Sequence, residues 1–147
     1  YAAVDFYDGS LLYDFSQKRM TVCDVDCFCK LPFSNQVGER YWGSTRLKAP
    51  EEYRLGAPIG RETAVFTLGA LFFHLFGRYL PQELEAMREN RAFFPCPRER
   101  WQLGEHTYQV AKQAASPAPG DRFPGVGRME AAWKEALARE AGEEETV

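Results

Sequence analysis

The stretch Val4–Phe28, VDFYDGSLLYDFSQKRMTVCDVDCF, decides how the first part of this chain folds. It sets five aspartates among aromatic and aliphatic residues. Residues 10–15 and 19–25 each have the β-branched, aromatic and aliphatic character of a strand, and the polar Ser16–Lys18 between them favours a tight turn. We therefore expect a β-hairpin here.

This hairpin makes a prediction about two of the acids. Asp5 precedes the first strand and Asp24 ends the second. Because antiparallel pairing brings the outer ends of a hairpin together, the two aspartates should become neighbours. Acids in apolar sequence are costly to bury unless something binds them, so the pair could form a site for a divalent cation. The alternative is that both aspartates only cap turns.

Composition places the chain among globular proteins. Its 147 residues are 45% hydrophobic and 14% aromatic, which is enough for the core of a single domain. A formal net charge of -3 gives no general attraction to nucleic acid or to an anionic membrane. The most apolar run, Ala64–Phe76, is too short to span a bilayer of about 30 Å, and the N-terminus lacks the pattern of a signal peptide. We expect a soluble, cytoplasmic protein with no nucleic-acid and no membrane partner.

The rest of the chain predicts a long loop and several helices. Residues 31–60 are rich in Pro, Gly, Asn and Ser, and their aromatic residues argue for an ordered loop. After Gly60, apolar residues occur at helical spacing and on the other faces as well, which predicts a helix surrounded by protein. Three further helices are expected at 81–89, 101–115 and 128–141. The predicted fold class is α+β, with a short β element and a mainly helical bundle.

The cysteines and one histidine have two interpretations each. Cys23, Cys27 and Cys29 could bind a metal together with Cys96, but their C-x3-C and C-x-C spacings are not the close pairs of structural zinc sites. Their neighbours favour a strand, in which free cysteine packs as a small apolar side chain. For His74, within the predicted central helix, a core position is expected rather than a ligand role.

An ordered series of motifs resembles the C-terminal lobe of the eukaryotic-like protein kinase fold, in particular bacterial serine/threonine kinase-like proteins and, more distantly, aminoglycoside phosphotransferases. VDFYDGS resembles the catalytic loop, with Asp5 at the catalytic aspartate and Ser10 at the asparagine that follows it. CDVD resembles the metal-binding motif, and Asp24 falls on the metal-binding aspartate with which that family motif begins. APE matches the end of the activation segment, and DRF is similar to the late motif whose Arg122 would pair with Glu51 of APE. The resemblance covers nearly the whole chain.

The resemblance implies an ATP- and Mg²⁺-dependent phosphotransferase that moves the γ-phosphate of ATP to a Ser/Thr hydroxyl of a protein. Asp5 would be the base, Asp24 and more weakly Ser10 would hold the metal, and Leu12 would lie under the adenine ring unless it is a core strand residue. Glu51 and Arg122 would form a buried structural pair. Residues 1–147 would then be a partial domain whose N-terminal lobe is absent. We expect these residues alone to bind ATP weakly or not at all.

Departures from the family pattern support a second interpretation. Ala3 and Val4 replace the His-Arg before the catalytic aspartate, Ser10 replaces the asparagine, and the aspartate of the central helix falls on Ala64. Tyr7 replaces a lysine, which removes a cation near the transferred phosphate. A pseudokinase or scaffold lobe would instead bind a partner through the activation segment, around Trp42 and Tyr53. Whether the chain is an enzyme stays open on the sequence alone.

Overall fold

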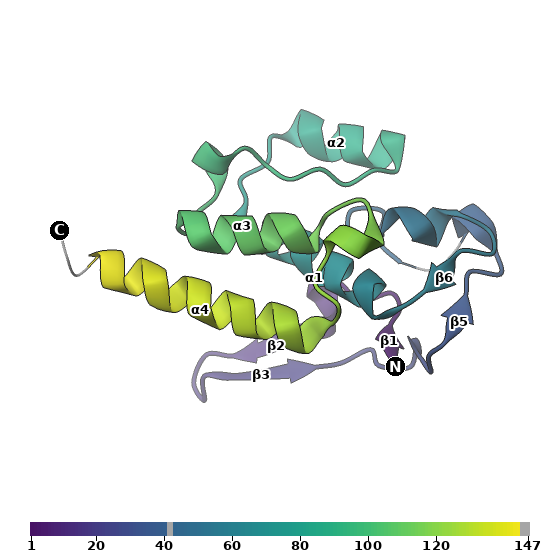
Figure 1. Cartoon of the computed structure of the whole chain (residues 1–147), viewed down its shortest axis with the longest axis horizontal. Helices are drawn as coiled ribbons and strands as arrows, with labels where there is room; N and C mark the ends of the chain where they lie inside the picture. Colours follow the sequence, from purple (N-terminus) through teal and green to yellow (C-terminus); the bar gives the residue numbers. More distant parts are fainter. Residues whose placement is uncertain (41–42, 145–147) are drawn as a thin grey trace.

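The computed structural model describes residues 1–40 and 43–144 as short antiparallel strand pairs followed by four helices (Figure 1). The predicted α+β class is confirmed. The strands are β1 (Ala2–Ala3), β2 (Leu11–Asp14), β3 (Arg19–Val22), β4 (Phe28–Cys29), β5 (Phe33–Ser34) and β6 (Pro58–Ile59). The helices are α1 (Arg61–Phe76), α2 (Pro81–Asn90), α3 (Glu105–Ala114) and α4 (Val126–Glu144).

The predicted hairpin is the pair β2–β3. Its register sets Leu11 opposite Val22. Asp14 fixes the turn, because its Oδ1 accepts a hydrogen bond of 2.8 Å from the backbone N–H of Ser16. The second strand ends three residues earlier than expected. Asp24 takes a left-handed backbone conformation with φ of 58°, which an extended strand cannot include.

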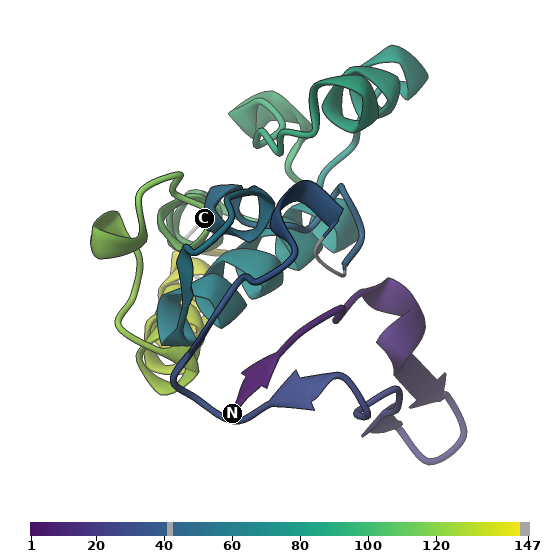
Figure 2. The same ribbon diagram turned by 90° about the vertical axis from the view of Figure 1, so that its right-hand side faces the viewer.

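The hairpin projects from the helical body rather than packing within it. Figure 2 shows the N-terminal segment, coloured purple and blue, as an arm that extends away from the helices. Three separate two-stranded pairs make up the β structure of the described residues, β1–β4, β2–β3 and β5–β6. Two-stranded hairpins are marginally stable by themselves, so the order of this part depends on its connections to the helices.

α1 is the central element of the helical body, as its sequence predicts. It buries side chains on most of its surface and packs against α3 and α4 (Figure 1). Phe73 lies at the centre of an aromatic cluster, with ring centroids 5.0–5.7 Å from those of Phe93, Trp101 and Tyr108. α1 and α3 meet closely at Gly69, where an added Cβ would lie 2.8 Å from the Cβ of Ala114.

The other helices match their predicted positions except that α4 is longer at both ends and that α3 starts later. This helix begins at Glu105 rather than at residue 101, because Trp101 forms a β-bridge with Gly77 instead. Glu140 of α4 caps the start of α3 by accepting the backbone N–H of Gly104 at 3.0 Å. None of the helices in residues 1–40 and 43–144 is long and apolar enough to cross a membrane.

In the segment 31–60, the described residues 31–40 and 43–60 form the predicted loop with short 3-10 turns, but they also contain the strand pair β5–β6, which was not predicted. Asn35 is fully buried, and its side chain links two parts of this segment. Its amide Nδ2 donates to the carbonyl oxygens of Gly38 at 2.9 Å and of Glu52 at 3.0 Å. Two of the aromatic residues on which the prediction relied, Tyr41 and Trp42, lie outside the described residues.

Candidate functional site

Asp5 and Asp24 lie on two facing segments that backbone hydrogen bonds hold together at both ends. At one end Ala3 of β1 pairs with Phe28 of β4. At the other end the N–H of Cys23 donates to the carbonyl of Ser10 at 2.9 Å. Asp5 occupies the outgoing segment between these pairings, and Asp24 occupies the returning one. The two acids were predicted to be neighbours because antiparallel pairing brings the ends of a hairpin together, and the segments that carry them are antiparallel here.

Electrostatic effects on Cys27 indicate that these acids share one neighbourhood. Burial and the negative charges of Asp26, Asp5 and Asp24 raise the pKa of the Cys27 thiol. Asp26 is exposed. The negative charges of these three aspartates therefore act on one thiol at this end of the arm.

Both candidate acids have a left-handed backbone and an exposed side chain. The φ angle is 58° at Asp5 and 58° at Asp24, a region that non-glycine residues seldom adopt although aspartate tolerates it. Within residues 1–40 and 43–144, neither carboxylate accepts a hydrogen bond, so the alternative that they cap turns is wrong for the described chain. Sparsely populated backbone conformations cluster at functional sites.

Ser10 and Leu12, the other two predicted ligand contacts, have contrasting environments. Ser10 is fully buried, and its Oγ accepts a hydrogen bond of 3.4 Å from the backbone N–H of Tyr7. Its hydroxyl therefore faces its own turn, and its role as a second metal ligand stays a prediction. Leu12 is 59% exposed, so the alternative that it is a core strand residue is wrong. Its contact with adenine also stays a prediction.

The cysteines form no metal centre in the part of the chain that the structure describes. No group of three or more His, Cys, Asp or Glu side chains there is arranged to hold a metal ion. Cys23, Cys27 and Cys29 are partly buried free thiols, whereas Cys96 is buried in the helical core. The packing role predicted for cysteine therefore fits Cys96 best.

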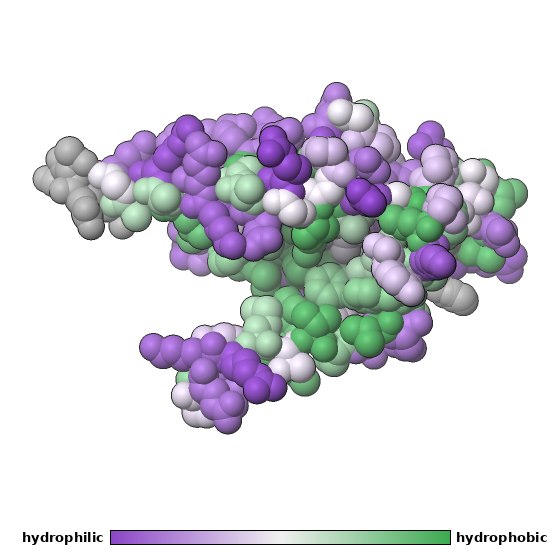
Figure 3. Space-filling model, turned by 60° about the horizontal axis from the view of Figure 1, so that its bottom comes forward, coloured by the Kyte–Doolittle hydropathy of each residue, from purple (hydrophilic) through white to green (hydrophobic). Residues whose placement is uncertain are grey.

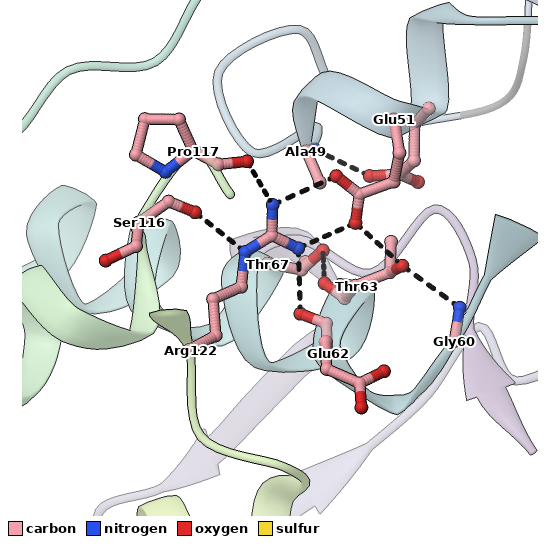
Figure 4. Close-up of polar contacts among 10 residues, drawn as sticks. Ala49, Glu51, Gly60, Glu62, Thr63, Thr67, Ser116, Pro117 and Arg122 are labelled. Atoms are coloured by element: carbon pink, nitrogen blue, oxygen red, sulfur yellow. Dashed lines mark hydrogen bonds and ion pairs between the residues drawn. The ribbon is translucent and has the colours of Figure 1, made fainter. Parts of the chain in front are cut away.

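Glu51 and Arg122 form the predicted pair, and it is buried (Figure 4). The guanidinium donates to both carboxylate oxygens of Glu51, at 2.6 and 2.9 Å. Its remaining hydrogen bonds reach the carbonyl oxygens of Ser116 at 2.7 Å, Glu62 at 3.1 Å and Pro117 at 2.8 Å. All five N–H groups of the guanidinium are thus used. The pair joins the segment before α1 to the loop before α4.

The surroundings of Glu51 keep its carboxylate ionised. Burial raises the pKa of Glu51, but the hydrogen bonds from Arg122 and from the Thr63 hydroxyl outweigh burial and hold the pKa below its ordinary value. The guanidinium carbon of Arg122 also lies 4.8 Å from the centroid of the Phe66 ring. Every polar group of this pair therefore has a partner despite its burial.

A second polar cluster, which the sequence did not predict, joins Asp8, Arg46 and His74. Asp8 Oδ1 lies 3.3 Å from Arg46 Nη2, and Asp8 Oδ2 lies 3.2 Å from His74 Nε2. Arg46 Nη1 lies 3.1 Å from His74 Nδ1. A proton on Nε2 lets the imidazole donate to Asp8, and Arg46 Nη1 lies 2.9 Å from the same ring nitrogen. The imidazole of His74 is hydrogen-bonded, as expected of a satisfied histidine, but its side chain is partly exposed, so the predicted core position is wrong.

Two buried charged residues, Lys48 and Glu52, lie next to the APE motif. Glu52 accepts the backbone N–H of Ala49 on Oε2 at 2.7 Å. Burial raises the pKa of Glu52 to about 7. Sequence reasoning missed both residues. The sequence held one indication, and only for Glu52: two consecutive glutamates, Glu51 and Glu52, follow Pro50.

An apolar groove of about 490 Å³ separates the N-terminal arm from α1 (Figure 3). In this view the hollow beside the arm is predominantly green, which marks hydrophobic residues. Its lining residues come from both sides of the gap: Tyr1, Ala3, Phe6, Val22, Val25, Phe28, Ala64, Thr67, Leu68 and Val126.

No protein-family model matches this chain, and no curated protein is detectably similar to it. Function therefore has to be inferred from the geometry of the site and the order of the motifs.

Proposed function

We propose that this chain is the catalytic lobe of a kinase-like phosphotransferase, which moves the γ-phosphate of ATP to a Ser/Thr hydroxyl of a protein. Asp5 is the general base and Asp24 is the Mg²⁺ ligand. The observation that carries the proposal is the placement of both carboxylates, exposed and without hydrogen bonds in the described chain, on segments pinned between the pairings Ala3–Phe28 and Ser10–Cys23.

The Glu51–Arg122 pair supports the same proposal. In the kinase pattern this pair fixes the end of the activation segment to the helical lobe, and here it spans 71 residues of sequence with all of its donors satisfied. The segment that it anchors also contains Ser44 and Lys48, which line a small cavity together with Asp5. A fixed segment beside the base is what positioning of a protein substrate requires.

The chemistry assigned to Asp5 is a single proton transfer. Its carboxylate accepts the proton of the substrate hydroxyl while the hydroxyl oxygen forms a bond to the γ-phosphorus. The bond from that phosphorus to the bridging oxygen breaks, and ADP leaves with the electron pair. The products are the phosphorylated hydroxyl, ADP and a proton, which Asp5 releases to solvent.

The oxygen donors at this end of the arm fit Mg²⁺. Mg²⁺ usually takes one or two protein carboxylates and completes its shell with phosphate oxygens and water. Asp24 is exposed and available as such a ligand, whereas a closed cage of several side chains is absent from the described residues. When bound, the metal neutralises charge on the phosphate oxygens.

The test is transfer of radiolabelled phosphate from ATP in the complete gene product that carries these 147 residues. Asp5→Asn and Asp24→Asn should each abolish transfer while changing the melting temperature by no more than about 2 °C, because both side chains are exposed. Asp121→Asn, at another exposed aspartate, is the matched control and should retain transfer. Wild-type transfer in both Asp5→Asn and Asp24→Asn would refute the assigned roles.

A second candidate function is a scaffold lobe that binds a partner without catalysis. The burial of the Ser10 hydroxyl favours it, because a buried hydroxyl turned toward Tyr7 is poorly placed for a metal. Tyr53, in the segment expected to bind partners, is partly buried, and Trp42 lies outside the described residues. Absence of phosphate transfer by the wild-type gene product at saturating ATP and Mg²⁺ would select this function.

A further inference from the structure

A small polar cavity lies beside Asp5, between the N-terminal arm and the segment that precedes APE. Its volume of about 10 Å³ is at the lower limit for holding a single water molecule. The charged side chains that line it are Asp5, Lys48 and Glu52, and Lys48 is the cation among its described lining residues. The remaining lining residues are Phe6, Gly43, Ser44, Leu47 and Thr67.

Packing fixes the Lys48 side chain at this position. The residue is only 5% exposed. Its stem lies against Gly43, where an added Cβ would come within 3.1 Å of Lys48 Cγ and where φ is 119°, so glycine is needed there. At the other end, Nζ lies 4.4 Å from the centroid of the Tyr53 ring and 3.5 Å from the carbonyl oxygen of Glu39.

The Lys48 ammonium interacts electrostatically with the candidate base. Burial lowers the pKa of Lys48, Glu52 and Asp5 raise it, and Arg91 lowers it further. The net direction is downward. The negative charge of Glu52, and less strongly that of Asp5, therefore favours an ammonium that burial disfavours.

The site needs positive charge at this point. Asp5, Asp24 and Asp26 are close enough to act on the same thiol, and a phosphoryl group would add more negative charge beside them. The catalytic-loop position that could hold a cation two residues after Asp5 is occupied by Tyr7.

We propose that Lys48 supplies positive charge beside Asp5 across this cavity and so assists Asp5 in phosphoryl transfer. This inference rests on the proposed phosphotransferase function and deepens it. Lys48 is a positioning residue, because it acts across the cavity through Asp5, and it reaches the site from the activation segment rather than from the catalytic loop.

The first experiment compares Lys48→Met and Lys48→Arg in the phosphate-transfer assay on the complete gene product. Lys48→Met keeps the stem and removes the charge, so kcat should fall by about tenfold or more while the KM for ATP stays within about twofold of wild type. Lys48→Arg should restore most of kcat. Lys112→Met, at an exposed lysine of α3, is the control and should leave kcat unchanged.

The second experiment follows the titration of the Lys48 ammonium by NMR in residues 1–147, without any substrate. Asp5→Asn should lower the pKa of Lys48, because it removes a negative charge that favours the ammonium. Asp121→Asn should leave that titration unchanged. An unchanged Lys48 titration in Asp5→Asn would overturn the inference, whatever the transfer assay shows.

The two proposals fail in different ways. Wild-type transfer in Lys48→Met, with none in Asp5→Asn, overturns the role of Lys48 and leaves the proposed function standing. Wild-type transfer in Asp5→Asn, or none in the wild-type protein, overturns the proposed function and this inference with it.

Discussion

The helical body and the N-terminal arm differ in whether their charged side chains have hydrogen-bond partners. The body buries an ion pair, Glu51–Arg122, and gives every donor of the guanidinium a partner. The arm leaves Asp5 and Asp24 exposed, in left-handed conformations and without hydrogen bonds from the described chain. Buried polar groups that are fully satisfied make a structure rigid, whereas unsatisfied carboxylates are available to a ligand.

The apolar residues follow the same division. In the body, the aromatic cluster around Phe73 is closely packed. In the arm, apolar side chains such as Tyr13 and Met20 are exposed along the hairpin, and Figure 3 shows an apolar hollow beside it. Stability should therefore come mainly from the helical body, and the candidate chemistry from the arm.

The largest expected effect is loss of the buried ion pair. Arg122→Met removes the partner of a buried carboxylate and should lower the free energy of unfolding by about 3–5 kcal/mol, measured by urea denaturation. The double variant Glu51→Gln with Arg122→Met should be less destabilised than Arg122→Met alone, because it leaves no unpaired charge at this position. Arg128→Met, at an exposed arginine of α4, is the control. A loss in Arg122→Met no larger than in that control would show that the body does not depend on this pair.

The next effect lies at the boundary between the two regions, at Glu52. Burial raises the pKa of Glu52 from 4.5 to about 7. Between these two pH values the folded protein therefore holds a proton that the unfolded chain has lost. The free energy of unfolding should therefore decrease as pH rises from about 4.5 to 7, by roughly 3 kcal/mol at 1.36 kcal/mol per pKa unit.

Glu52→Gln should remove this pH dependence, because the amide keeps an oxygen for the N–H of Ala49 and does not ionise. Urea denaturation of both proteins between pH 5 and pH 8 measures the difference. Parallel curves for the two proteins across this range would contradict the buried, protonated state of Glu52.

The sequence predicted the features that depend on local pattern and on the order of the motifs that resemble those of kinases. Hydrophobic periodicity predicted α1, turn chemistry predicted the hairpin, and motif order predicted the partnership of Glu51 with Arg122. Local pattern could not place His74, because its partners Asp8 and Arg46 are distant in sequence and come near it only in the folded chain. Lys48 and Glu52 were missed for the same reason, since their burial is a property of the assembled fold.

A smaller effect is expected at Asp8, where the arm contacts the body. Burial raises the pKa of Asp8, but the charges of His74 and Arg46 outweigh burial and lower it below the ordinary value of 3.8. The ionised carboxylate therefore stabilises the fold above pH 3.8, and this contribution is lost as pH falls through the folded pKa. Because the side chain is 39% exposed and solvent screens the pair, Asp8→Asn should cost less than about 1 kcal/mol at pH 7.

The difference in stability between wild type and Asp8→Asn should shrink as the pH is lowered through the folded pKa of Asp8. The reason is that protonation of wild-type Asp8 removes the same charge. Thermal unfolding followed by circular dichroism at pH 7 and at low pH measures both values. Asp14→Asn is not a suitable control, since Asp14 fixes the hairpin turn, but Asp121→Asn is. An equal effect at both pH values would mean that Asp8 acts by packing rather than by charge.

The smallest effect is expected on the hairpin itself, and a pair of methionines makes the comparison direct. Met20 of β3 is 58% exposed, whereas Met129 of α4 is 2% exposed. Met129→Ala should lower the free energy of unfolding by about 2–5 kcal/mol, because it leaves a cavity against α1. Met20→Ala should change it by no more than about 0.5 kcal/mol, since little apolar area leaves water at that position on folding. A loss at Met20 comparable to that at Met129 would mean that the exposed face of the arm is covered in solution, and the division between a stabilising body and an open arm would then be wrong.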